Sequence, residues 1–385
     1  MNNNVLMHLS LISHIGPGTI FKIINALCPT AFAVWRSGST DIDHVHVKSV
    51  LLELYNFTPS DFVTQCGLSV ATAQKCHDAL LDTDLLDQEL GLAIKNNVQI
   101  AILFDDAYPY LLRQINIPPA VIYYRGQLNW IDPSKSLAIV GSRQATRYSV
   151  RVIDHIVPDL IASGWSIVSG GATGVDTFAH EKVLQLGGHT VAVLGCGLLQ
   201  NNKKIFTDIV ARGGAVVSPF PLTFPASQTT FPARNRIIAG LSVGTLVIEA
   251  PQESGALITA KYALDENRHV YAVPGPIDDY LSQGSHNLIR SGAMLVSNAT
   301  QILEDLGYRV EQHEQAIEYE NKLPKIIIQE NDENADLFRV LDRARPLEDI
   351  AQLINCSPQD ALDQLFGLQL EGKVSQTFAG LWERQ

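Results

Sequence analysis

Two arginines and an amide in the stretch FPARNR, residues 231–236, form the part of this sequence best suited to hold an anion. Arg234 and Arg236 flank Asn235 at the start of a predicted helix. Unpaired backbone N–H groups and the helix dipole favour an anion at such a start. Phe231 adds an aromatic face on which a base can stack. The pattern therefore predicts a ligand longer than a mononucleotide, a chain of phosphates that carries bases.

Short glycine- or serine-containing turns elsewhere supply further anion-binding positions. Each follows an apolar run and precedes a helical pattern, so that backbone can approach a phosphate closely. The planar guanidinium of Arg143 is suited to stack on a base or to pair with a phosphate. None of these turns is a GxGxxG or a GK[ST] sequence, so no NAD or ATP site and no cofactor is expected. The candidate residues in these turns are Ser142, Arg143, Gly170, Gly171, Gly174, Ser254 and Gly255.

Two titratable residues near these turns allow other interpretations. Glu249 ends the apolar run TLVIEA and has the chemistry of a general base, but a glutamate there more often pairs with an arginine such as Arg234 or Arg236. Asp176, in the string SGGATGVD, is predicted to cap or orient its loop. No catalytic residue is assigned.

Seven short apolar runs position these turns. Helical patterns such as 147–164 and 256–267 lie between several of them, which is typical of a parallel sheet covered on both faces. Ligands bind such sheets at the carboxyl ends of the strands, where the candidate residues fall. The fold class predicted is α/β, a Rossmann-like, doubly wound and mostly parallel sheet. The runs are SLAIVGS, WSIVSGG, HTVAVLG, AVVSPF, TLVIEA, HVYAVPG and AMLVSN.

The flanking segments are different in character. Residues 1–130 are predicted to be mostly helical, with a helical domain over 1–100. Its helix–Gly16-Pro17-Gly18–helix pattern fits a helix-hairpin-helix unit or a tight connection inside a bundle, and the acidity of the segment favours the bundle. The sheet domain is expected over 101–308, an acidic linker over 309–335, and a winged helix over 336–385. The third helix of that module carries Asp360 and Asp363, which favours protein contact or dimer support over DNA reading.

The net charge of −12 is unevenly distributed. Residues 135–300 hold 13 Lys and Arg against 11 Asp and Glu, a balance of +2, whereas residues 1–134 hold 7 against 12 and residues 301–385 hold 8 against 17. A groove in the middle segment can bind phosphate despite the global sign, but the global field does not steer DNA towards it. Charge alone therefore does not establish nucleic-acid binding.

Composition also bounds the location of the protein. Its five cysteines form no CxxC pair, which argues against a structural zinc site or a disulfide framework and fits a reducing cytosol. No apolar run reaches the roughly 18 residues of a membrane span. We therefore expect a cytoplasmic protein with no bound metal and no membrane partner.

Several strings, taken in order over residues 105–298, resemble the DNA-processing protein A family (DprA/Smf) of bacteria. They are GSR, SGGATGVD, GHTVAVLGCG, FPARNRIIAGLS, ESGALITA, VPGPI and GSHNLIRSGA. The resemblance implies an extended Rossmann-like domain with an N-terminal helical domain, of the SAM or helix-hairpin-helix kind, and a C-terminal winged helix. It also implies single-stranded DNA binding, loading of the RecA recombinase in natural transformation, and a homodimer formed through the central domain.

Position by position, the resemblance assigns strand contacts to Ser142, Arg143, Gly170, Gly171, Phe231, Arg234 and Asn235, and Arg236 continues the motif. The chain departs from the family at Ser218-Pro219, where Ser-Glu is usual. A non-catalytic DNA-binding protein is thus the first hypothesis. The second is a Rossmann-like nucleotide-hydrolysing enzyme, similar to the phosphoribohydrolases, with Glu249 as base and Arg236 as phosphate clamp; the PGGxGTxxE string of those enzymes is absent.

Overall fold

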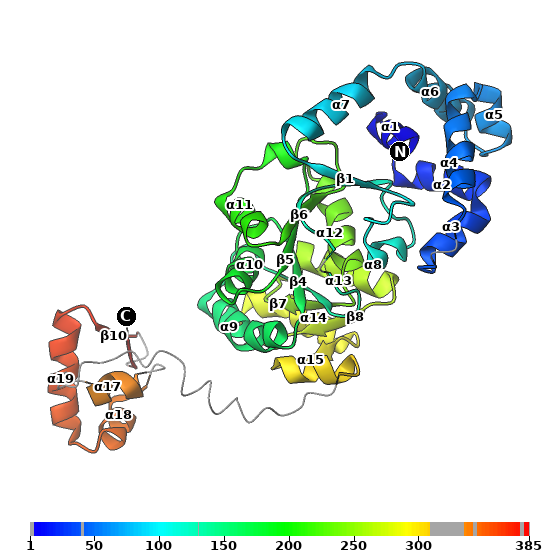
Figure 1. Cartoon of the computed structure of the whole chain (residues 1–385). Helices are drawn as coiled ribbons and strands as arrows, with labels where there is room; N and C mark the ends of the chain where they lie inside the picture. The colour runs from blue at the N-terminus through cyan, green and yellow to red at the C-terminus, as the bar shows by residue number, and fades with distance from the viewer. Residues whose placement is uncertain are drawn as a thin grey trace. The chain divides into compact units, whose positions relative to one another are not determined.

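The computed structural model describes residues 4–39, 42–129, 131–308, 335–341, 345–377 and 381–384. The chain divides into two compact units, Met1–Arg309 and Val310–Gln385, which are described separately (Figure 1). The predicted linker, 309–335, lies outside the described residues except for Ala335, which begins a helix.

A 9-stranded sheet forms the centre of the first unit, in the order β1-β2-β6-β5-β4-β3-β7-β8-β9. The strands from β6 to β9 in this order are all parallel, and β1 and β2 add an antiparallel edge. The seven predicted runs are confirmed as β3 to β9. The strands are β1 (Gln99–Ile102), β2 (Val121–Gly126), β3 (Ser136–Gly141), β4 (Ser166–Gly170), β5 (Thr190–Val193), β6 (Ala215–Ser218), β7 (Gly244–Ile248), β8 (His269–Ala272) and β9 (Met294–Leu295).

The sheet is doubly wound, as predicted, because the chain runs from β3 towards β6 in one direction and from β7 towards β9 in the other. Right-handed crossovers then place the two sets of helices on opposite faces. Helices α9, α10 and α11 cover one face and α12 and α13 the other (Figure 1). The helices after β3 are α9 (Arg147–Ala162), α10 (Val175–Gln185), η2 (Leu198–Gln200), α11 (Lys204–Ala211), α12 (Thr230–Gly240), α13 (Gly255–Asp265), η3 (Tyr280–Ser282), α14 (Gln283–Arg290) and α15 (Ala299–Asp305).

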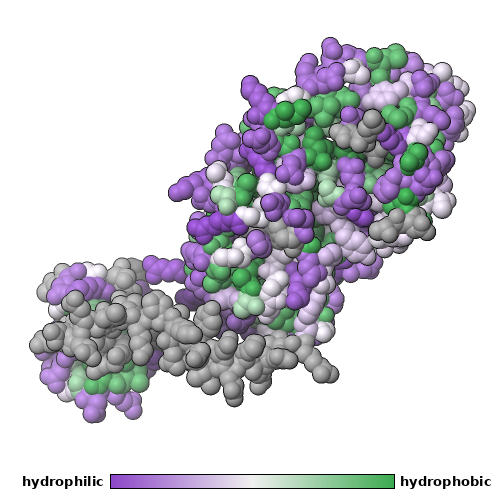
Figure 2. Space-filling view, in the orientation of Figure 1, coloured by the Kyte–Doolittle hydropathy of each residue, from purple (hydrophilic) through white to green (hydrophobic). Residues whose placement is uncertain are grey.

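The central parallel strands, which are covered on both faces, consist mostly of apolar residues, whereas both residues of the edge strand β9 are exposed. Every residue of β4, β5 and β7 is buried, which is why their sequences read as continuous Val, Ile and Leu runs instead of alternating. On the face shown in Figure 2, hydrophilic residues predominate and apolar residues occur in scattered patches.

The N-terminal helical domain is confirmed, and its helices share one apolar core with the sheet. Helix α1 packs on α2, α6 and α7 and also reaches β1 and β2. The hydroxyl of Ser69 accepts a hydrogen bond from the Thr72 backbone N–H, so Ser69 is the predicted N-cap of α6. The elements are α1 (Asn4–Leu11), α2 (Pro17–Leu27), α3 (Pro29–Arg36), α4 (His44–Leu52), η1 (Glu53–Asn56), α5 (Pro59–Thr64), α6 (Val70–Leu80), α7 (Asp84–Lys95) and α8 (Tyr110–Arg113).

The prediction of a mostly helical segment up to residue 130 is wrong at its end, because β1 and β2 lie there. Residues 121–124, VIYY, have the β-branched and aromatic character of a strand, and β2 pairs with the distant β6. Within the described residues, no single helix has the length and hydropathy to cross a membrane; the bent pair α2 and α3 meets the criterion by length and composition only.

The second unit has the order of elements predicted for a winged helix. An isolated antiparallel β-bridge pairs Arg345, just before the second helix, with Trp382. Ser357 is the N-cap of the third helix, as expected. Leu337, Ile350 and Trp382 are among the residues of its separate core. The elements are α17 (Ala335–Val340), α18 (Leu347–Leu353), α19 (Pro358–Leu370), β10 (Val374–Gln376) and β11 (Trp382–Arg384).

Candidate nucleic-acid interface

The carboxyl ends of β3 and β7 mark the point where the winding of the sheet reverses, which is where ligands bind in folds of this kind. The backbone N–H of Ser142, after β3, donates to the carbonyl of Glu249, after β7, at 2.7 Å. The carbonyl of Ser142 in turn accepts from the backbone N–H of Val175, at the start of α10, at 3.1 Å. Ser142 is buried, and its backbone holds three loops together.

Glu249 is 2 % exposed and adopts a left-handed backbone conformation, with φ of 46°. Its carboxylate accepts hydrogen bonds from the Thr146 backbone N–H at 3.0 Å and the Thr146 hydroxyl at 2.5 Å, and from the Ser149 hydroxyl. These donors belong to the N-terminus of α9, where the helix dipole favours a negative charge. The expectation that Glu249 pairs with Arg234 or Arg236 is therefore wrong, because the helix end provides nearer donors.

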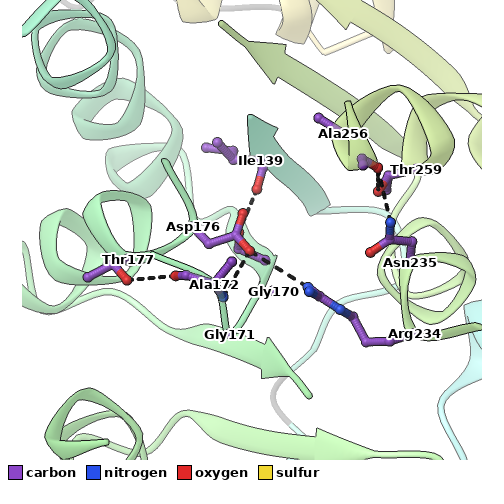
Figure 3. Close-up of polar contacts among 12 residues, drawn as sticks. Ile139, Gly170, Gly171, Ala172, Asp176, Thr177, Arg234, Asn235, Ala256 and Thr259 are labelled. Carbon is purple, nitrogen blue, oxygen red and sulfur yellow. Dashed lines mark hydrogen bonds and ion pairs between the residues drawn. The ribbon is translucent and has the colours of Figure 1, made fainter. Parts of the chain in front are cut away.

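Arg234 is a buried cation beneath the ends of β3 and β4. Its Nη1 lies 3.6 Å from Oδ2 of Asp176, and the two side chains are only 6 % and 8 % exposed. Figure 3 shows them pointing towards one another beside Gly170. Burial lowers the pKa of Arg234, and the neighbouring Asp176 carboxylate opposes that shift. The Nε atom of Arg234 has no hydrogen-bond partner in the described part of the chain.

The expected position of Arg234 at a helix start is wrong, because α12 begins at Thr230 and Arg234 lies in its second turn. The Arg234 guanidinium fits at the end of β4 because residue 170 is a glycine and has no side chain. A Cβ added to Gly170 would overlap both Arg234 Nη1 and Asp176 Oδ2. Asp176 orients its loop, as predicted, by accepting a hydrogen bond from the Ala172 backbone N–H at 3.3 Å.

A buried histidine that the sequence interpretation did not single out supports the same loop. Nε2 of His180 lies 2.9 Å from the Gly170 carbonyl, and Nδ1 lies 2.7 Å from the Thr190 hydroxyl. Burial lowers the pKa of His180, so the ring is held neutral. His180 therefore fixes the end of β4. In the sequence, this role was marked only by the position of the histidine four residues after Asp176.

Arg143 and Phe231 form the exposed part of the interface. The Arg143 guanidinium lies over the Phe231 ring, 5.1 Å from its centroid. Arg143 is exposed, and among the described residues no carboxylate forms an ion pair with it. Phe231, whose ring was predicted to offer a face to a base, is half-buried. Its ring packs where Gly195, after β5, has no side chain, 3.0 Å from the Cβ position.

Gly174 allows the loop of Arg143 to approach the start of α10. Its φ is 80°, and a Cβ there would overlap the carbonyl oxygens of Ser142 and Arg143. A Cβ added to Gly171 would lie 2.7 Å from the Leu194 side chain and 3.0 Å from the Phe206 ring. Both glycines therefore serve close packing of the chain at the strand ends, and their expected approach to a phosphate stays a prediction.

Asn235 lies on the β7 side of the interface, where it is hydrogen-bonded to the start of α13. Its side-chain amide donates to the Gly255 carbonyl at 3.0 Å, and Figure 3 shows Asn235 beside the start of α13. The Ser254 hydroxyl caps α13 by accepting from the Ala256 backbone N–H at 3.2 Å. Arg236 is not brought into the site. It pairs with Glu266 at 3.0 Å instead, because a step of two residues on a helix turns the side chain by about 200°.

Lys203 is a residue that the sequence interpretation missed. It is exposed, and its Nζ donates to the Gly171 carbonyl at 2.8 Å, which brings a positive charge to the end of β4. The only signal in the sequence was the pair Lys203-Lys204, at the start of helix α11. We define the strand-end surface by the residues Arg143, Gly170, Gly171, Lys203, Phe231 and Arg234.

This surface combines two exposed cations, a buried third one and an aromatic ring along one edge of the sheet. Such a combination suits a ligand with repeated negative charges and flat rings. In the described residues, no cluster of three or more His, Cys, Asp or Glu side chains could hold a metal ion.

Comparisons with known proteins agree with the geometry. The model of the family described as DNA recombination-mediator protein A matches residues 99–307. The DNA processing protein DprA of Bacillus subtilis is 31% identical over 277 residues, 70% of this chain and 93% of that protein. Protein Smf of Synechocystis is 42% identical over 220 residues, 55% of this chain and 55% of that protein, so the match spans about half of that relative's length.

A solved structure shows the same fold. The DNA processing protein A of Streptococcus pneumoniae superimposes with a TM-score of 0.63 and 28% identity, covering 80% of this chain and 99% of that chain. The family model covers more than half of the residues, including every member of the strand-end surface. The chain therefore belongs to the DNA-processing protein A (DprA/Smf) family.

Proposed function

We propose that the strand-end surface binds single-stranded DNA and that it does so without catalysis. The observation that carries the proposal is the exposed Arg143 guanidinium stacked over Phe231 at the end of β3. The cation neutralises a phosphate, and the aromatic side offers a face to an unpaired base. A duplex keeps its bases stacked on one another, so this arrangement favours a single strand.

The remaining residues of the surface support the same ligand. Lys203 carries a second exposed positive charge, and the buried guanidinium of Arg234 adds a positive charge beneath the loop. The overall charge of −12 does not attract DNA from a distance, so the local cations must provide the affinity. Binding is then expected to depend strongly on salt.

Further parts of the proposal follow from family membership. We include loading of a RecA-type recombinase onto the bound strand, protection of incoming DNA in natural transformation, and a cytoplasmic location. A homodimer through the central domain is supported by exposed apolar side chains of the edge strand β9, Met294 and Leu295, and of the segment after β8, Ile277 and Tyr280.

The test is fluorescence anisotropy with a labelled single-stranded oligonucleotide, a duplex competitor and a salt series. Arg143→Ala is expected to weaken binding roughly tenfold and to reduce the salt slope by about 0.7, the value for one phosphate contact on a single strand. Arg147→Ala, an exposed arginine on the first turn of α9, is the matched control and should bind as the wild type does. Equal losses in both variants, or equal affinity for a mononucleotide and a long oligonucleotide, would contradict the proposal.

The nucleotide-hydrolysing alternative requires a base that can reach water. All three interactions of the Glu249 carboxylate are with α9, and the residue is 2 % exposed. Arg236, its proposed phosphate clamp, pairs with Glu266 instead. Release of free base from a nucleoside monophosphate, abolished by Glu249→Gln, would restore this alternative.

A further inference from the structure

Two phenylalanines beside the strand-end surface are held in place outside the core. Phe220 and Phe224 lie in the loop between β6 and α12, with ring centroids 5.5 Å apart and planes inclined by 18°. Phe224 is 42 % exposed, and neither ring is part of the apolar core or packs against it. We call this pair the aromatic platform. Phe220 is half-buried and Phe224 is exposed, so the Phe224 ring gains little from burial and stability does not account for its position.

The loop that carries the platform is firmly anchored below the rings. The Gly197 backbone N–H donates to the Phe224 carbonyl at 2.8 Å, and the Phe220 backbone N–H donates to the Ser218 hydroxyl at 3.0 Å. Leu222, which lies between the two phenylalanines in the sequence, is fully buried. Its backbone N–H donates to the side chain of Glu89, in α7, at 2.7 Å. The rings are therefore presented by a fixed backbone, which reduces the entropy lost when a ligand stacks on them.

The platform lies close to Phe231 because both contact the same three-residue segment after β5. Phe231 packs on Gly195, and the Phe224 backbone binds Gly197. Two residues of extended chain span at most about 7 Å. Only glycine fits at position 197, because a Cβ there would overlap the carbonyl oxygens of Pro221 and Leu222.

The order of the strands gives the direction of a path. Arg143 follows β3, Lys203 contacts the end of β4, Phe231 covers the end of β5, and the platform follows β6. Neighbouring strands are about 4.8 Å apart, so this path is roughly 14 Å long. That is about four nucleotides at the stacked spacing of 3.4 Å.

We propose that the aromatic platform is a base-stacking subsite that extends the DNA path from Phe231 to the β6 side of the sheet. The inference rests on the proposed function, since its ligand is the same single strand. Stacking needs no particular base, because every base offers a π face. A protein ligand at these rings is the competing interpretation, and the alignment of the platform with the cations and with Phe231 favours DNA.

Length dependence separates this subsite from the phosphate contacts. Phe224→Ala is expected to weaken binding of a 12-mer of deoxythymidylate roughly tenfold, the loss of about one stacked base. The salt slope should be unchanged, because no phosphate contact is lost. A stacked 3-mer covers only about 7 Å, half of the path from Arg143 to the platform, so its affinity should fall much less than that of the 12-mer. Phe224→Trp should bind the 12-mer at least as tightly as wild type, and Phe224→Leu should behave like Phe224→Ala.

Leu81→Ala, an apolar side chain 68 % exposed beside α6, is the control and should leave both affinities unchanged. Photocrosslinking of a 5-iodouracil 12-mer should place adducts on Phe220 or Phe224. Thermal unfolding of each variant checks that the fold is retained.

If the wild type does not bind single strands at all, the proposed function fails and this inference with it. If wild type binds and Arg143→Ala weakens it, but Phe224→Ala and Phe224→Leu leave the 12-mer affinity unchanged, only the platform is overturned. A change of oligomeric mass in those variants, with unchanged DNA affinity, would assign the rings to a protein contact instead.

Discussion

The strand-end surface and the winged helix both have architectures that often contact nucleic acids, but they display charge in opposite ways. At the strand ends, Arg143 and Lys203 are exposed, and Arg234 lies beneath them. In α19, the third helix of the winged module, the charged residues are Asp360 and Asp363, with no Lys or Arg. Phosphate contact depends on such local charge, so the charges of the first surface suit DNA and those of α19 do not.

The two regions also differ in how their charges are fixed. The Asp176–Arg234 pair is buried and determined by Gly170, whereas Asp360 is exposed and bonds locally to Ser357 at 2.6 Å. A buried pair cannot lose one partner without leaving an uncompensated charge, while an exposed one contributes little. The architecture of a domain therefore says less about its ligand than the placement of its charges does.

Among the variants that test this comparison, Gly170→Ala is expected to cause the largest loss of stability and of single-strand affinity. The new methyl group must displace the Arg234 guanidinium or the Asp176 carboxylate, and breaking a buried pair costs about 3–5 kcal/mol. Urea unfolding followed by circular dichroism measures the free energy of unfolding, and single-strand affinity should fall with it.

Gly255→Ala is the matched control for this variant. It lies in the same site at the first position of α13, and its nearest neighbour, Asn235 Nδ2, is 3.9 Å from the Cβ position. Alanine is tolerated there, so the change in stability should be within about 1 kcal/mol. A comparable loss in the two variants would mean that Gly170 does not determine the buried pair.

A smaller effect is expected from Glu249→Gln. The amide nitrogen of glutamine cannot accept the hydrogen bonds that one carboxylate oxygen now receives, so the free energy of unfolding should fall by about 1–3 kcal/mol. The exposed Glu253, four residues on, provides the control Glu253→Gln, for which we expect no measurable change. If Glu249→Gln were as stable as wild type, the carboxylate would not be the structural cap that the contacts indicate.

The local features of the strand-end surface could be predicted from the sequence. Apolar runs that end in glycine identify parallel strands and their turns, because strand burial and backbone approach both depend on neighbouring residues. Gly174 and Ser254 were found in this way, and both lie at the start of a helix after a strand, as their pattern predicts; their contact with an anion stays a prediction.

The pairing of charges could not be predicted in the same way. Asp176 and Arg234 meet only because β4 and α12 pack together, and no local pattern specifies that contact. Arg236 is a different case, since helical geometry alone places it on the side of α12 away from Arg234. Strand β2 was also missed, although its sequence was suitable, because its partner β6 lies about ninety residues further along the chain.

The smallest effect is expected in the winged helix, from Lys373→Ala. Lys373 lies directly before β10, is half-exposed, and pairs with Glu371 at 2.7 Å, so its charge is already compensated by a neighbour. An exposed pair of this kind contributes about 0–1 kcal/mol to stability, and its removal should change single-strand affinity less than twofold. Anisotropy measured beside Arg143→Ala, on the same oligonucleotide and at the same salt, gives the comparison directly. A loss in Lys373→Ala as large as that in Arg143→Ala would reverse the contrast between the two regions. It would show that a wing cation contacts phosphate despite the acidic helix next to it.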